Sequence, residues 1–168
     1  MERGGKRLIP ALAFLIGALP AFLVGCQSGF WNRVGMPVSP ANRILLKQGG
    51  PEEGAFYTRD LLLVYHYVRD GDSLQMSGTV ELRGSTQDFG WLHRLFVRAY
   101  FFGPDGRVLD SEPLLVRGRG RSEHTWNFSK TLTLPPRTKG MAIGYSGHVR
   151  GVGIDAPSWD FWETPFSE

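Results

Sequence analysis

The sequence predicts an all-β protein whose folded part is an antiparallel β-sandwich of about seven strands. From residue 55 onward, apolar and polar residues alternate over several short segments, which is the period of a half-buried strand. Residues that favour turns separate these segments, and no segment has the apolar period of an amphipathic helix. Together these observations favour two packed sheets over a helical or mixed fold.

The expected strands follow one another along the chain. Residues 56–68 are apolar on both faces and rich in β-branched and aromatic residues, which is typical of a central strand. Apolar and polar residues alternate clearly over residues 74–82, 94–101, 125–134 and 141–145. Weaker strand patterns cover residues 108–116 and 159–166. Turns are predicted at Asp70-Gly71-Asp72, Gly103-Pro104-Asp105-Gly106 and Pro135-Pro136.

The N-terminal segment has the pattern of a signal peptide. Arg3, Lys6 and Arg7 precede an apolar run over residues 8–22, and the only cysteine follows shortly after it. The four residues Leu23-Val24-Gly25-Cys26 resemble the lipobox of bacterial lipoproteins. This resemblance implies that residues 1–25 are removed and that Cys26 becomes the lipid-bearing first residue of the mature protein.

An uncleaved transmembrane helix is the alternative for this segment. Residues 8–24 fall short of the roughly 20 apolar residues that a span requires, and they contain two prolines. A lipoprotein carries two or more acyl chains, which hold a protein durably on a membrane. Gln27 stands where an aspartate marks inner-membrane lipoproteins, so the resemblance implies the outer membrane, on its periplasmic face.

The chain is therefore expected to have three parts. Residues 1–25 are the signal peptide, residues 26–54 are the lipidated cysteine and a flexible tether, and residues 55–168 are the β-sandwich domain. Glycine, proline and serine recur in the tether, and a coil of this length reaches roughly 30 Å on average. Phe30 and Trp31 either lie at the lipid headgroups or pack back on the domain.

The mature domain resembles the Ig-like modules of bacterial lipoproteins, including FxLYD-type domains. Residues 76–80, 96–102 and 104–109 carry the resemblance: a strand with a glycine, an alternating strand that ends in aromatics, and an Asp-Gly turn. The match covers residues 73–134 and departs from the pattern where Phe102-Gly103 replaces a Tyr-Asp pair. It implies an Ig-like sandwich and transfers no functional residue.

Composition narrows the expected partners. The chain has 19 basic and 16 acidic residues, and removal of residues 1–25 takes away three basic residues and one acidic residue. The mature net charge is then near +1, which gives no reason to expect nucleic acid. A single cysteine excludes an internal disulfide. No cofactor and no metal site are expected, because the histidines lack paired ligand spacing: His66, His93, His124 and His148.

Two segments are candidates for contact with a ligand or a partner. Arg117, Arg119 and Arg121 occupy alternate positions, on one face if extended, where guanidinium groups grip phosphates or carboxylates. A solvated loop, with Glu123 offsetting the charge, is the alternative. Trp159 and Trp162 flank an acid and an aromatic residue, a composition that stacks on the sugar rings of peptidoglycan. Ordinary packing in a sandwich is the alternative for them.

The sequence thus predicts a lipid-anchored envelope protein with a non-catalytic sandwich, acting as a binding or structural component of an envelope assembly. An edge strand or the C-terminal aromatic segment is the expected contact with a partner protein. Binding of glycans or anionic lipid headgroups is the alternative. A hydrolase comes third, because no sequence context marks a catalytic pair among Asp60, Asp88 and Asp110.

Overall fold

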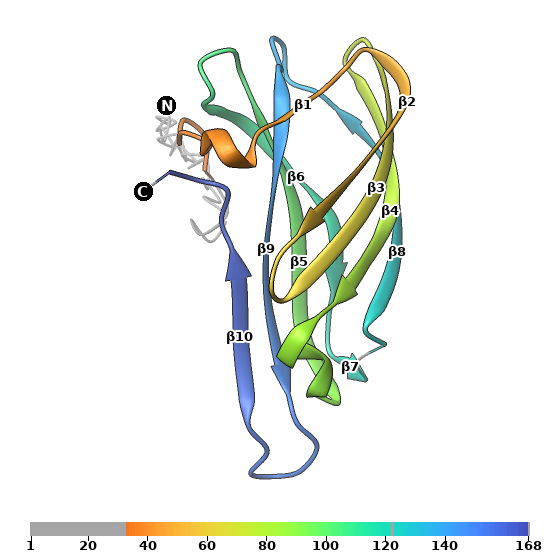
Figure 1. Ribbon diagram of the computed structural model, residues 1–168, viewed down its shortest axis with the longest axis vertical. Helices are drawn as coiled ribbons and strands as arrows, with labels where there is room; N and C mark the ends of the chain where they lie inside the picture. The colour runs from red at the N-terminus through yellow and green to blue at the C-terminus, as the bar shows by residue number, and fades with distance from the viewer. Residues whose placement is uncertain (1–32, 122, 168) are drawn as a thin grey trace, which may run out of the picture.

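The computed structural model describes residues 33–121 and 123–167, which form two antiparallel β-sheets (Figure 1). The first sheet contains β1 (Ile44–Leu45), β5 (Trp91–Phe102), β6 (Val108–Arg117), β7 (Gly120–Arg121), β9 (Gly140–Arg150) and β10 (Ser158–Glu163). The second sheet contains β2 (Gly49–Tyr57), β3 (Leu61–Asp70), β4 (Ser73–Leu82) and β8 (Thr125–Thr133). The prediction of an all-β antiparallel sandwich is confirmed.

The described chain departs from the predicted strand count, since it has ten strands instead of about seven. Two of the additional strands, β1 and β7, are only two residues long. The run over residues 56–68 is not one central strand, because Thr58, Arg59 and Asp60 turn the chain between β2 and β3. The Thr58 hydroxyl oxygen closes this turn by accepting a hydrogen bond from the Leu61 backbone N–H at 3.1 Å. Short 3-10 helices also occur, at Pro40–Asn42 (η1) and Gly84–Asp88 (η2).

Strands β5 and β9 form the centre of the first sheet. The far side of β9 is shared by β1 at its Gly140 end and by β10 at its Arg150 end. The far side of β5 is shared in the same way by β6 and β7. The second sheet has the order β2-β3-β4-β8. In Figure 1, β10 stands at the left-hand edge beside β9, away from the second sheet.

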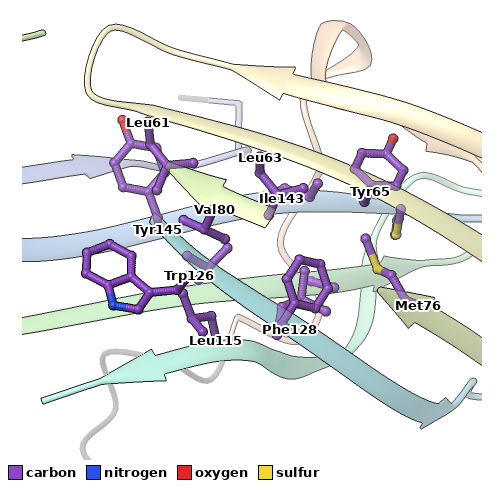
Figure 2. Packing of buried hydrophobic residues seen from close by; sticks show 14 of the residues in the cluster. Leu61, Leu63, Tyr65, Met76, Val80, Leu115, Trp126, Phe128, Ile143 and Tyr145 are labelled. Carbon is purple, nitrogen blue, oxygen red and sulfur yellow. The ribbon is translucent and has the colours of Figure 1, made fainter. Parts of the chain in front are cut away.

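The core lies between the two sheets and follows from the alternation of side chains along each strand. Every second residue of β3 and β4 points toward the first sheet, and all of these except Arg69 and Gly78 are buried there. Figure 2 shows how residues of β3, β4 and β8 meet those of β6 and β9: Leu61, Leu63, Tyr65, Met76, Val80, Trp126, Phe128, Leu115, Ile143 and Tyr145. This shared layer fixes which face of each sheet remains outside.

The folded domain begins before residue 55. Residues 33–54, which the sequence assigns to the tether, pack on the sandwich and contribute β1 and the start of β2. Val38 is completely buried and pairs with Phe166, while Pro37 pairs with Arg107. Glycine and proline interrupt the alternation of apolar and polar residues in this segment, so that periodicity alone does not predict its strands. The signal peptide, Cys26 and the rest of the predicted tether up to residue 32 lie outside the described residues.

A second, smaller apolar cluster lies on the outer side of the first sheet. It joins the N-terminal segment and the C-terminal tail to β5, β6 and β9 through Val38, Phe166, Tyr100, Phe102, Val108 and Ala142. The Tyr100 and Phe166 rings meet edge to face, with centroids 5.0 Å apart. These segments cover the end of the sheet near Gly140 and leave the end near Arg150 uncovered. In the described part of the chain, no helix is long and apolar enough to cross a membrane.

Candidate functional site

The outward-facing side of the first sheet, here called the outer face, gathers exposed charged and aromatic side chains. Strand pairing arranges them in rows that cross the sheet. One row contains Ser158, Arg150, Trp91 and Arg121; the next contains Asp160, His148 and Arg94; a third contains Trp162, Ser146, Phe96 and Val116. The outer face therefore draws its side chains from strands far apart in the sequence.

The predicted row of three arginines does not form on a single face. Strand β6 ends at Arg117, the chain bends, and β7 begins at Gly120. Arg117 pairs with the core residue Leu95, whereas Arg121 pairs with Trp91 on the outer face. The difference arises because β5 holds one extra residue, His93, opposite β9, and such a bulge reverses the alternation of faces. All three arginines are exposed.

Arg94 and Arg150, which are not among the predicted contact residues, share the outer face with Arg121. Arg150 of β9 and Arg121 of β7 both pair with Trp91, so the two arginine positions flank the tryptophan position on one face. Arg94 lies in the neighbouring row. Of these residues only Arg94 lies in a predicted strand, and only the register brings them together.

Basic side chains are distributed unequally between the two sides of the sandwich. At the outward-facing strand positions of the second sheet, the described residues include no lysine or arginine. Those positions carry polar, acidic and a few apolar side chains, such as Glu53, Tyr57, Val64, His66, Gln75, Ser77, Thr79, Glu81, Asn127 and Thr131. The outer face of the first sheet carries Arg94, Arg98, Arg121 and Arg150. Among the outward-facing strand positions, basic side chains therefore occur on the first sheet and not on the second.

A polar network ties β10 to the outer face. The Asp160 carboxylate lies 2.9 Å from His148 Nδ1 and accepts a hydrogen bond of 3.4 Å from Arg94. The His93 ring meets His148 edge to face at 5.2 Å. Burial lowers the pKa of His93, and the positive charges of Arg119, His148 and Arg150 lower it further. Arg119 is exposed and directly precedes β7, whose Gly120 pairs with Leu92 next to His93.

A groove of about 670 Å³ runs along β10 on this side of the molecule. Its lining combines Arg33, Arg94, Phe96, Tyr100, Trp162 and Phe166 with parts of β9 and β10. Gly147 allows β10 to lie close, because a Cβ at this position would overlap the Phe161 ring that packs on it. The result is an apolar channel with charged side chains at its margin, of a size suited to a ligand or a peptide.

The two candidate tryptophans point to opposite sides of β10. Trp162 lies on the outer face and is 64% exposed, and it contributes to the groove. Trp159 pairs with Val149 on the core side, yet it remains partly exposed because β10 is an edge strand. The Arg59 guanidinium lies 5.9 Å from the centroid of the Trp159 ring. The pair therefore offers two separate aromatic surfaces instead of one stacking platform.

The three acids considered for a hydrolase belong to different elements. Asp60 follows β2 and is buried, Asp88 ends η2, and Asp110 lies in β6, where it accepts from the Ser111 backbone N–H at 2.7 Å. Within residues 33–121 and 123–167, no group of three or more histidine, cysteine or acidic residues is placed to hold a metal ion.

The buried Tyr145 hydroxyl links the turn after β2 to the first sheet. It lies 2.8 Å from the Thr58 hydroxyl and donates to Asp60 Oδ2 at 3.4 Å. Burial raises the pKa of Tyr145 to about 12; the hydrogen bond with Thr58 opposes this rise and the charge of Asp60 adds to it. The neutral phenol is therefore the form that the fold favours.

Alkaline pH is expected to destabilise the fold partly through this group. Between about pH 10 and pH 12 the unfolded chain loses the Tyr145 proton while the folded chain retains it, so the free energy of unfolding falls as pH rises. Tyr145→Phe should make this fall shallower in chemical denaturation at several alkaline pH values, even though it removes two hydrogen bonds at neutral pH. The exposed Tyr57→Phe is the control, and equal slopes in both variants would contradict the assignment.

Comparison of the chain with protein-family models and with curated protein sequences finds no match. The assignment of function therefore depends on the residues and their geometry.

Proposed function

We propose that the chain is a lipoprotein of the bacterial cell envelope, anchored through Cys26 to the periplasmic face of the outer membrane. Its sandwich is a non-catalytic module that binds another envelope protein and serves as a component of an envelope assembly. The lipobox pattern Leu23-Val24-Gly25-Cys26 supports the anchor. The exposed edge of β10 supports the binding role, and it is the observation on which this proposal depends.

An exposed strand edge offers unpaired backbone groups to another chain, and proteins usually blunt such edges with proline, lysine, bulges or short length. The other edges of this sandwich carry these devices. Strand β2 has Pro51 and a register shift, β6 has Pro113 and two register shifts, and β8 has Lys130. Strands β1 and β7 have only two residues each.

Strand β10 lacks this protection. Its six residues pair in unbroken register with β9 and include neither proline nor lysine. Trp159 and Trp162 stand exposed on its two faces. A strand of a partner protein added along β10 would satisfy its backbone groups, while the two indoles would pack on the partner's side chains and provide specificity.

Capture of partners by the anchored protein tests this proposal. Trp162→Lys places a charge on the β10 edge without altering a buried residue, and it is expected to abolish co-purification of the partner after mild cross-linking in intact cells. Tyr57→Lys is the matched control, because Tyr57 is an equally exposed aromatic residue at the end of β2. Unchanged capture by Trp162→Lys, with loss in the control, would contradict a role for β10.

Binding of a glycan or an anionic headgroup is a second candidate function. The observation that favours it is Trp91, which lies between Arg121 and Arg150 on the outer face. An indole beside two guanidinium groups suits a ligand that has both an apolar surface and a negative charge. This contact uses a sheet face, whereas strand addition uses the β10 edge, so one molecule can make both.

A further inference from the structure

The short segment between Cys26 and Arg33, the first described residue, limits the distance between the sandwich and a lipid anchor. Arg33 lines the groove on the outer face, and its guanidinium lies 5.8 Å from the centroid of the Phe166 ring. Cys26 precedes Arg33 by seven residues, and a fully extended chain of that length spans at most about 25 Å. An anchor at Cys26 therefore keeps the bilayer close to the side of the molecule that carries the outer face.

The charge of that side complements an anionic lipid surface. Arg94, Arg121 and Arg150 occupy outward positions on it, whereas the outward positions of the second sheet carry acids and no basic residue among those described. Arg119 and Arg121 take part in no salt bridge found among the described residues. Basic residues held near an anionic membrane surface each favour attachment, with a strength that salt reduces.

Exposed apolar side chains accompany these arginines. Trp91 is 39% exposed between Arg121 and Arg150. The loop from β9 to β10 follows Arg150 directly and presents Val152 and Ile154, of which Ile154 is 91% exposed. Tryptophan at the headgroup level and aliphatic side chains at the boundary with the acyl chains are typical of surfaces that rest on a bilayer.

We propose that the outer face docks on the anionic phospholipid surface of the membrane that carries the anchor. Arg119 and Arg121 contact lipid phosphates, while Trp91 and Ile154 enter the headgroup region. This inference rests on the proposed lipid anchor at Cys26. It also sets the orientation of the sandwich, with the outward-facing side of the second sheet directed away from the membrane.

Fluorescence quenching in vesicles tests the docked orientation. The mature lipidated protein is reconstituted into vesicles of phosphatidylcholine with brominated acyl chains, either alone or with about a third of phosphatidylglycerol. At low salt, phosphatidylglycerol is expected to increase tryptophan quenching, and high salt should remove the increase. The increase should fall several-fold in Trp91→Phe and in the double variant Arg119→Gln, Arg121→Gln, because they lack the docked indole or two phosphate contacts.

A double variant with the same loss of charge elsewhere, Lys130→Gln, Arg137→Gln, should retain the full increase. Equal quenching in the two kinds of vesicle, or an unchanged increase in the Arg119 and Arg121 variant, would overturn the docking proposal. Flotation of the same vesicles separates this outcome from a failure of the anchor. Protein that floats with pure phosphatidylcholine is anchored whatever its orientation, and protein that does not float contradicts the lipoprotein assignment itself.

Discussion

Phe128→Ala is expected to lower the free energy of unfolding by about 3–5 kcal/mol. Phe128 is buried in β8 and pairs with Gly78 of β4, and its ring lies 2.9 Å from the position that a Cβ on Gly78 would occupy. The ring thus fills the space that the glycine leaves. Alanine would lose the burial of the ring and leave a cavity that Gly78 has no side chain to fill. Chemical denaturation followed by tryptophan fluorescence measures the change.

Thr131→Ala provides the matched comparison on the same strand. Thr131 is exposed on the outward side of the second sheet, and its replacement should change the free energy of unfolding by less than about 1 kcal/mol. Similar losses in both variants would show that the register of β8 is wrong.

The alternation of apolar and polar residues is sufficient to predict the sandwich, because a strand with one buried face has an apolar residue at every second position. The segments over residues 74–82 and 125–134 alternate cleanly, and the structure places them in the neighbouring strands β4 and β8. Where both faces carry apolar residues, alternation gives no boundary. For this reason the β2–β3 hairpin appears in the sequence as one strand over residues 56–68, although the Thr58 side chain closes a turn within it.

The packing of residues 33–54 depends on contacts that are distant in the sequence. Val38 is buried because Tyr100, Phe102 and Phe166 form an apolar surface outside the first sheet, and a sandwich predicted from alternation has no such second cluster. A segment with glycine and proline then resembles a tether, although its backbone pairs with Arg107 and Phe166. Because the burial of this segment depends on residues distant in the sequence, its own apolar and polar residues do not alternate regularly.

In the candidate site, too, local sequence predicts some features and contacts between distant residues determine the others. The residue types of the outer face are evident in the sequence, but their grouping depends on strand register. One extra residue at His93 sends Arg117 and Arg121 to different faces and sets Arg121 and Arg150 on either side of Trp91. Short-range patterns do not reveal a bulge, because the bulge is defined by its partner strand. Trp159 and Trp162 likewise point to opposite faces of β10, because side chains alternate between the faces along a strand.

Cys26→Ser is expected to abolish lipid attachment and to prevent removal of the signal peptide. Serine lacks the thiolate that forms the thioether with the lipid. Metabolic labelling with palmitate should therefore fall to background, and a larger precursor should accumulate because cleavage follows lipidation. Ser28→Ala, two residues beyond the cysteine, is the control and should be labelled and processed normally.

This variant also tests whether the anchor positions the outer face. Only six residues lie between Cys26 and Arg33, so lipid attached at Cys26 keeps the arginines close to the lipid phosphates. Lengthening this segment by a glycine and serine insert of about 20 residues should preserve labelling, yet weaken the phosphatidylglycerol-dependent quenching as the effective concentration of the surface falls. A labelled Cys26→Ser protein that migrates like the wild type would refute the anchor, and with it the reason for this proximity.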